Sequence, residues 1–162
     1  MNKTEVYDFL DSKGIFYEVT EHKAVYDMEE MAEIGLPYPE DNAKNLFVRD
    51  DKKRNYYLIT VKGEKRVNLK AFRNAHGTRP LTFASAEDLL AIMKLTPGAV
   101  TPLGILNDDH RQVAFYLDKD FLEGNGRIGC HPNENTATVW LNSRDLLNMI
   151  EEHGNAVHIV KL

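Results

Sequence analysis

Patterns typical of short β-strands and of helices follow one another irregularly along this chain, and that order limits the folds open to it. Segments rich in β-branched and aromatic residues indicate strands, and apolar residues at helical spacing separate some of them. The order is not a regular strand–helix–strand repeat. We therefore predict an α/β domain of the α+β type, with a mixed, mostly antiparallel sheet or partial barrel and surrounding helices. The predicted strands are residues 15–22, 44–49, 55–62, 79–84, 112–118, 126–131, 136–142 and 156–162.

Capping residues mark where several helices begin. Asp27, Ser85 and Ser143 each precede a helical pattern and have the short polar side chain that an N-cap needs. Gly14 is a plausible end for the first helix. Residues 36–41, LPYPED, are predicted to be a loop because two prolines in four residues break regular structure. The predicted helices are residues 4–12, 28–35, 67–75, 86–94 and 144–154.

The length and composition suit one globular domain over residues 1–162. An apolar fraction of 43% is enough for a core without metal or disulfide support. The single cysteine, Cys130, cannot form an intrachain disulfide, which fits a reducing compartment. The N-terminal stretch has no apolar core of the signal-peptide type, and no run approaches the ~20 apolar residues of a membrane span. We expect a soluble cytoplasmic protein that does not bind membranes.

Charge is distributed unevenly, although the formal net charge is only −5. Residues 1–41 carry eleven acidic and three basic side chains, whereas residues 52–79 carry nine basic side chains and one acidic one, Glu64. A local basic surface can bind phosphates whatever the charge of the whole chain. The alternative is a solvated, lysine-rich hairpin, and charge alone favours that interpretation.

Residues 96–104, TPGAVTPLG, form a stiff stretch between two apolar segments. Proline fixes φ and withholds a donor, and glycine lets the backbone approach a ligand closely. Such a stretch can present bare backbone groups to a substrate in a rigid frame. Taken alone, the weak G-x-x-x-P pattern favours a plain connector after a helix.

Common catalytic centres find little support in the sequence. One cysteine and the lack of paired ligand spacing argue against structural zinc, and Cys130 fits a buried, inert thiol better than a nucleophile. Neither a nucleophile elbow nor a phosphate-binding glycine loop is present. Two residues remain. Lys44 is either a solvated strand end or a fixed cation facing a cleft, and His131 is either structural or part of a site.

Three motifs occur in order: KNLFV from Lys44, GAVTP from Gly98 and GCHPNENTATV from Gly129. Together they resemble the YbaK/ProX family of prolyl-tRNA editing domains, which are related to the insertion domain of bacterial prolyl-tRNA synthetases. The resemblance covers nearly the whole chain, and it is strongest to the freestanding members that remove alanine from mischarged tRNA(Pro).

The resemblance implies an editing-domain fold and hydrolysis of an aminoacyl-tRNA ester without a cofactor or metal. It implies catalytic roles for Lys44, near the 3′-terminal adenosine, and for Gly98. The residues implied to bind the substrate are Asn45, Ala99, Val100, Thr101, Pro102 and His131.

The resemblance also implies a partner for the basic segment, residues 52–79: the acceptor stem of tRNA(Pro). Prolyl-tRNA synthetase is a second expected partner. The residues expected to contact RNA phosphates are Lys62, Lys65, Arg66 and Lys70. Two other functions stay open: a deacylase for Cys-tRNA(Pro), and a non-catalytic paralogue that binds tRNA or a synthetase. A small-molecule hydrolase unrelated to RNA is less compatible with the basic segment.

Overall fold

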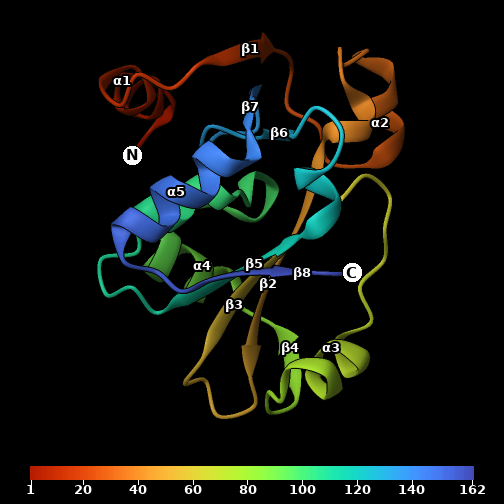
Figure 1. Cartoon of the computed structure of the whole chain (residues 1–162), viewed down its shortest axis with the longest axis vertical. Coiled ribbons are helices and arrows are strands. Elements are labelled where there is room, and N and C mark those ends of the chain that lie inside the picture. The colour runs from red at the N-terminus through yellow and green to blue at the C-terminus, as the bar shows by residue number, and fades with distance from the viewer.

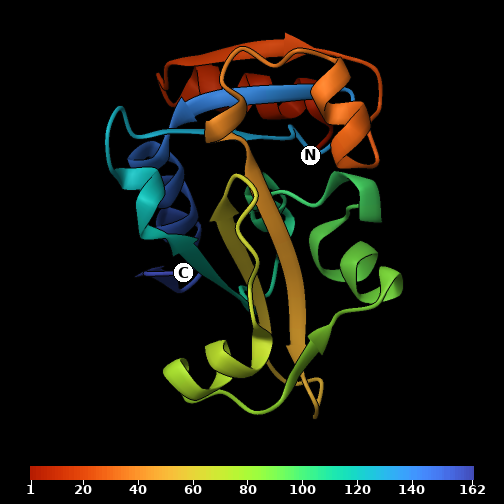
Figure 2. The same ribbon diagram turned by 90° about the vertical axis from the view of Figure 1, so that its right-hand side faces the viewer.

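The computed structural model describes residues 1–162, apart from the side chain of Met28. Its strands form two sheets (Figure 1). The smaller sheet is antiparallel and has the order β1 (Tyr17–Glu21), β7 (Ala137–Asn142) and β6 (Arg127–Cys130). Figure 2 shows this sheet at the top of the molecule, beside α1 (Lys3–Ser12) and α2 (Met28–Glu33).

The larger sheet has five strands in the order β4, β2, β3, β5, β8 and is mixed. Strand β2 pairs antiparallel with β3 and β4, whereas β5 runs parallel to both β3 and β8. The prediction of a mixed, mostly antiparallel arrangement is confirmed, and the two sheets do not close into a barrel. The bounds are β2 (Ala43–Asp50), β3 (Tyr56–Lys62), β4 (Leu81–Phe83), β5 (Val113–Asp118) and β8 (Val157–Val160).

Alternation along β2 divides the apolar side chains between two cores. Phe47 faces the main core, which lies between the sheets and includes buried residues of α1, α4 (Ala86–Met93) and α5 (Ser143–His153). Leu46 and Val48 face the opposite side, where Phe72 of α3 (Leu69–His76) completes a smaller core. The strand is therefore buried on both faces, which fixes its register.

Helix starts follow the capping chemistry, with one correction. Asp27 and Ser85 cap α2 and α4 as predicted. The predicted cap Ser143 is wrong: Asn142 caps α5, because its backbone is extended and its side chain accepts a hydrogen bond from Arg144 N. Ser143 is the first helical residue, and its hydroxyl donates to the Phe121 carbonyl.

Two smaller points complete the description. The predicted loop at 36–41 contains a short 3-10 turn, Pro39–Asp41, which starts with proline in its first turn. Within the described part of the chain, no helix has the length and apolar character that a membrane span requires.

Candidate functional site

Residues 96–107 contain two short 3-10 turns, Pro97–Ala99 and Pro102–Asn107. Each turn begins with proline, where a missing N–H costs no helical hydrogen bond. Gly98 is exposed on the first turn, whereas Ala99, Thr101 and Pro102 are buried. This 98–102 loop therefore shows bare backbone to solvent on one side and is anchored in the core on the other.

Side chains from two other motifs hold the 98–102 loop in place. The Thr101 hydroxyl donates to the His131 carbonyl at 2.7 Å, and the Asn45 amide donates to the Val100 carbonyl at 3.2 Å. Asn45 is itself fixed, because its oxygen accepts a 2.6 Å hydrogen bond from the Thr60 hydroxyl on the neighbouring strand. The structure thus brings together Asn45, the loop and His131, which the sequence predicted as substrate-binding residues.

His131 follows β6 and presents an imidazole of defined tautomer. Its Nδ1 lies 2.9 Å from the Ala137 carbonyl, which can only accept, so Nδ1 carries the proton and Nε2 is an unprotonated acceptor. Burial lowers the pKa of His131, and the neighbouring His22 lowers it further, while the bond to Ala137 acts in the opposite sense. The ring is therefore neutral at pH 7.

Lys44 lies on the opposite face of β2 from Asn45, as neighbours in a strand must. Its side chain is exposed, and its ammonium donates to the Lys65 carbonyl at 3.3 Å, on the connection that follows β3. The structure places Lys44 beside that connection, whereas Asn45 contacts the 98–102 loop. The predicted strand implies that the two side chains point apart, but only the structure shows which of them faces the 98–102 loop.

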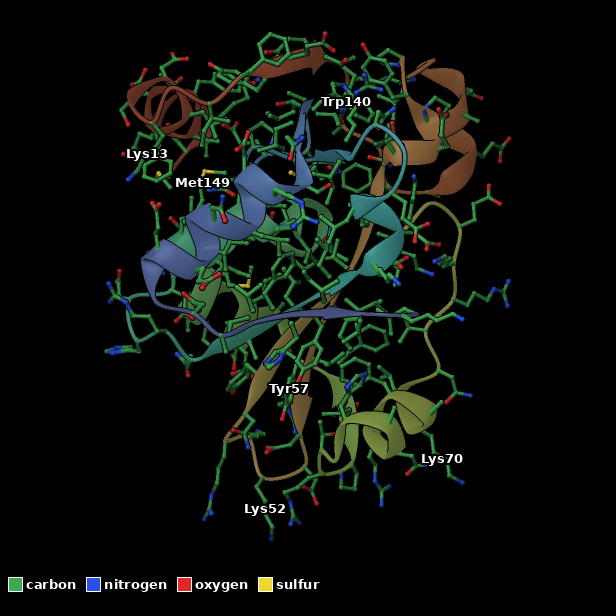
Figure 3. All side chains as sticks on the ribbon, viewed as in Figure 1. Lys13, Lys52, Tyr57, Lys70, Trp140 and Met149 are labelled. Atoms are coloured by element: carbon green, nitrogen blue, oxygen red, sulfur yellow. The ribbon has the colours of Figure 1, made fainter. Side chains whose placement is uncertain are left out.

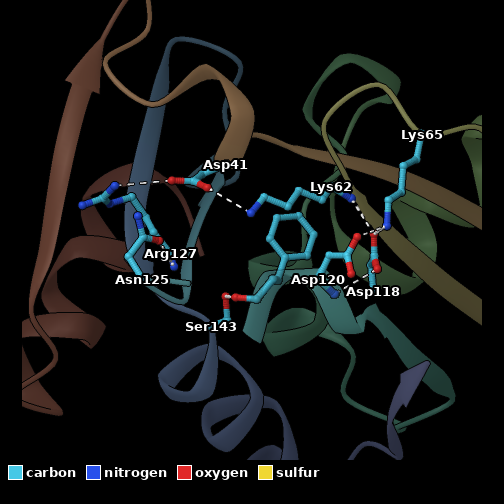
Figure 4. A network of polar contacts seen from close by, with 9 residues as sticks. Asp41, Lys62, Lys65, Asp118, Asp120, Asn125, Arg127 and Ser143 are labelled. Atoms are coloured by element: carbon cyan, nitrogen blue, oxygen red, sulfur yellow. Dashed lines mark hydrogen bonds and ion pairs between the residues drawn. The ribbon is translucent and has the colours of Figure 1, made fainter. Parts of the chain in front are cut away.

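Two of the four predicted RNA contacts are engaged in ion pairs within the protein. Figure 4 shows Lys62 against the buried Asp41 and Lys65 against Asp118 and Asp120. Burial alone would lower the pKa of Lys65, but its hydrogen bonds with the two carboxylates outweigh that effect and raise this pKa. The other two predicted contacts, Arg66 and Lys70, are exposed.

Cys130 is buried at the end of β6, where burial raises the pKa of its thiol to about 12. It is a thiol at neutral pH, which agrees with the inert role predicted for it. Among the described residues, no group of three or more His, Cys, Asp or Glu side chains is arranged to hold a metal ion.

Sequence reasoning missed several residues that shape the site. Asn135 is buried, and its side-chain amide bonds both the N–H and the carbonyl of Val25, far away in sequence. Tyr26 lies next to Gly98, on the segment that Asn135 holds. The Asn-rich turn after His131 was visible in the sequence. No sequence pattern near Val25 indicated that Asn135 binds its backbone.

Comparison with known proteins identifies the family of this chain. The aminoacyl-tRNA editing domain profile matches residues 22–149. The chain is 38% identical to prolyl-tRNA editing protein ProX of Acetoanaerobium sticklandii over 160 residues, which are 99% of this chain and 97% of that protein. It is 35% identical to mouse (Mus musculus) prolyl-tRNA synthetase associated domain-containing protein 1 over 156 residues, 94% of this chain and 92% of that protein.

A solved structure supports the fold independently. The crystal structure of a candidate trans-editing enzyme for prolyl-tRNA synthetase superimposes with a TM-score of 0.72 at 22% identity, covering 99% of this chain and 96% of that one. At this identity the likeness concerns the fold alone. The profile match and the near full-length relatives carry the assignment further: the chain belongs to the aminoacyl-tRNA editing domain family.

Proposed function

We propose that this protein is a trans-editing hydrolase that removes alanine from mischarged Ala-tRNA(Pro) and spares Pro-tRNA(Pro). Family membership and the likeness to prolyl-tRNA editing protein ProX support hydrolysis of an aminoacyl ester on a tRNA. The observation that carries the proposal is the anchored 98–102 loop, which Asn45 and Thr101 hold against the turn that carries His131.

The chemical need for a second site follows from the limits of binding. A pocket built for proline cannot strongly exclude alanine, since each methylene contributes only ~1–3 kcal/mol of discrimination. A second site that admits only the smaller product completes a double sieve. A loop of small residues with fixed backbone can set such a size limit: the methyl group of alanine enters and the pyrrolidine ring of proline does not.

The reaction makes modest demands on the protein, because the ester is already activated. The site has to position a water molecule and stabilise the oxyanion that forms on the ester carbonyl. Gly98 has no side chain and is exposed, so the ester can approach its backbone closely. The neutral His131 offers Nε2 as an acceptor for the α-ammonium group of the bound alanine.

Lys44 has a proposed role in holding the 3′-terminal nucleotide. Its ammonium is exposed and its present partner is a backbone carbonyl, so it can exchange that bond for a charge-assisted one with a phosphate. Arg66 and Lys70 are proposed to contact acceptor-stem phosphates directly. Lys62 and Lys65 contribute less, because Asp41, Asp118 and Asp120 already offset their charge.

Prolyl-tRNA synthetase is the proposed protein partner, since mammalian relatives are named as domains associated with it. The proposed location is the cytoplasm, which is consistent with editing of charged tRNA. The competing function within the family is hydrolysis of Cys-tRNA(Pro), because cysteine and alanine differ in side-chain size by one sulfur atom.

The test is deacylation of Ala-, Cys- and Pro-tRNA(Pro) and of Ala-tRNA(Ala), with Lys44→Ala as a variant. We expect fast loss of alanine from Ala-tRNA(Pro) alone, and no turnover in a folded Lys44→Ala protein. Preferential hydrolysis of Cys-tRNA(Pro) would replace the proposed substrate. Full activity of Lys44→Ala would remove this lysine from the mechanism, and no hydrolysis of any substrate would contradict the proposed function.

A further inference from the structure

Tyr26 is a large aromatic residue that lies at the site without being buried. Its side chain is 75% exposed, although it precedes α2 directly and neighbours residues of the core. The Cδ1–Cε1 edge of the ring rests on Gly98: a Cβ atom at that position would lie 3.0 Å from Cε1 and 3.4 Å from Cδ1. The absence of a side chain at Gly98 therefore lets the ring lie against the 98–102 loop.

The backbone that carries Tyr26 is held on both sides. Val25 is buried, and the Asn135 amide bonds both its N–H and its carbonyl. On the other side, Asp27 caps α2, and the Tyr26 N–H donates to the Glu30 carboxylate at 3.2 Å. Three consecutive residues are thus fixed by separate contacts, and the middle one directs its ring outward.

An exposed ring on a fixed backbone forgoes the stabilisation that its burial would supply. One edge of the ring contacts the loop, and most of its surface is open to a partner. An aminoacyl-tRNA brings a planar aromatic group next to its ester, namely the adenine base of the terminal nucleotide. Every nucleobase has a π-face that stacks on aromatic side chains.

We infer that Tyr26 is the stacking platform for the terminal adenine of the aminoacyl-tRNA bound at the 98–102 loop. This inference rests on the proposed function, because it takes the ester of a charged tRNA to sit at this loop. Tyr26 then positions the nucleotide that carries the ester, while the loop limits the size of the amino acid. Both contacts meet at Gly98, so the base and the aminoacyl group are aligned by the same backbone.

The experiment compares Tyr26→Leu, which removes the ring, with Tyr26→Phe, which keeps it. Phe16→Leu is the matched control, because Phe16 is an equally exposed aromatic (78%) on the segment between α1 and β1. The binding probe is tRNA(Pro) with 2-aminopurine in place of the terminal adenine and alanine attached through a non-hydrolysable amide. Stacking on an aromatic ring quenches the fluorescence of this base.

We expect quenching with the wild type, Tyr26→Phe and Phe16→Leu, and little quenching with Tyr26→Leu at saturating protein. For Ala-tRNA(Pro), Tyr26→Leu raises KM by about 10-fold to 100-fold and leaves kcat within about twofold, as expected for the loss of one base–aromatic stack. The thermal midpoint stays within about 2 °C of the wild type, because so exposed a side chain contributes little to the core.

The outcomes separate this inference from the proposed function. Quenching by Tyr26→Leu equal to that of the wild type overturns the stacking role, whatever the activity. An unchanged KM in Tyr26→Leu, with an active wild type, also overturns it. A wild type that quenches the probe in a Tyr26-dependent way but hydrolyses no ester supports the stacking role and contradicts the proposed hydrolase.

Discussion

At the scale of single residues, His131 shows how the fold sets the chemistry of one side chain. The Ala137 carbonyl fixes its tautomer, and burial lowers its pKa and keeps it neutral, so Nε2 is an unprotonated acceptor. A histidine at a strand end had two interpretations from the sequence, structural and functional. The structure shows the structural one, because the backbone carbonyl of His131 anchors Thr101, and a functional role for its ring remains a proposal.

The lowered pKa of His131 predicts a pH dependence of stability. The unfolded chain binds a proton at this ring with an ordinary pKa near 6.5, whereas the folded protein binds it less tightly. Stability from this residue is present above pH 6.5 and is lost as the pH falls below it. We expect the free energy of unfolding in urea to fall more between pH 7.5 and 5.5 for the wild type than for His131→Gln. An equal fall in both proteins would contradict the shift.

At the scale of elements, the sequence predicted what local chemistry determines. Caps such as Asp27 and Ser85 and the β2–β3 hairpin follow from side chains a few residues apart. The prediction of Ser143 rather than Asn142 as the cap of α5 failed because two adjacent polar residues can both cap, and only backbone geometry separates them. The parallel pairing of β3 with β5 joins segments far apart in sequence, and no local pattern encodes it.

The same division holds for the candidate site. The sequence pointed to the 98–102 loop, Asn45 and His131 through motifs that lie in one stretch each. It could not show that Asn45 faces the loop while Lys44 faces away, which depends on the phase of β2 in the sheet. It also held no sign of the contact between Tyr26 and Gly98, because two separate segments create it.

Strand β6 leads to His131, and Gly129 controls how closely it packs on β7. Gly129 is opposite Trp140 in the register, and a Cβ atom there would collide with the indole ring. We expect Gly129→Ala to lower the free energy of unfolding by about 1–3 kcal/mol, as overpacking does. In a Trp140→Leu background the same substitution should cost clearly less. Equal costs in the two backgrounds, measured by urea unfolding, would show that the ring is not the obstacle.

At the scale of the whole molecule, buried Asp41 ties the two sheets together. Its carboxylate lies 3.4 Å from Lys62 at the end of β3 and 3.3 Å from Arg127 at the start of β6. Figure 4 draws both ion pairs as dashed lines. A backbone bridge between Asn42 and Gly129 joins the sheets at the same level. The ion pairs therefore support the relative position of the sheet that carries His131 and the sheet that carries Asn45.

Removing the charge of Asp41 tests this link. Asp41→Asn should lower the free energy of unfolding by about 1–2 kcal/mol, because two partly exposed cations lose a charged acceptor. Glu40→Gln is the control, since Glu40 is exposed and its substitution should change stability by less than about 0.5 kcal/mol. If both variants unfold at the same urea concentration, Asp41 does not hold the sheets together.

The distribution of charge predicts where RNA lies on the molecule. Figure 3 shows Lys70 and Lys13 on opposite sides. Lys70→Glu combined with Arg66→Glu should weaken tRNA binding and reduce the slope of log K against log salt by about 0.9 for each phosphate that the protein no longer neutralises. Lys13→Glu should leave both unchanged. Binding of the double variant at wild-type strength across a salt series would move the RNA to another surface.

In the proposed function, the anchored 98–102 loop sets the size of the amino acid that is hydrolysed. The most direct measurement is the ratio of kcat/KM for Pro-tRNA(Pro) to that for Ala-tRNA(Pro), in the wild type and in Val100→Gly. Val100 is partly buried and its carbonyl is held by Asn45, so we expect a shorter side chain to enlarge the proposed pocket while Asn45 still holds the loop. We expect the ratio to rise by at least about tenfold, because the loss of even one methylene of discrimination has an effect of this size. An unchanged ratio in a folded, active Val100→Gly protein would contradict the account.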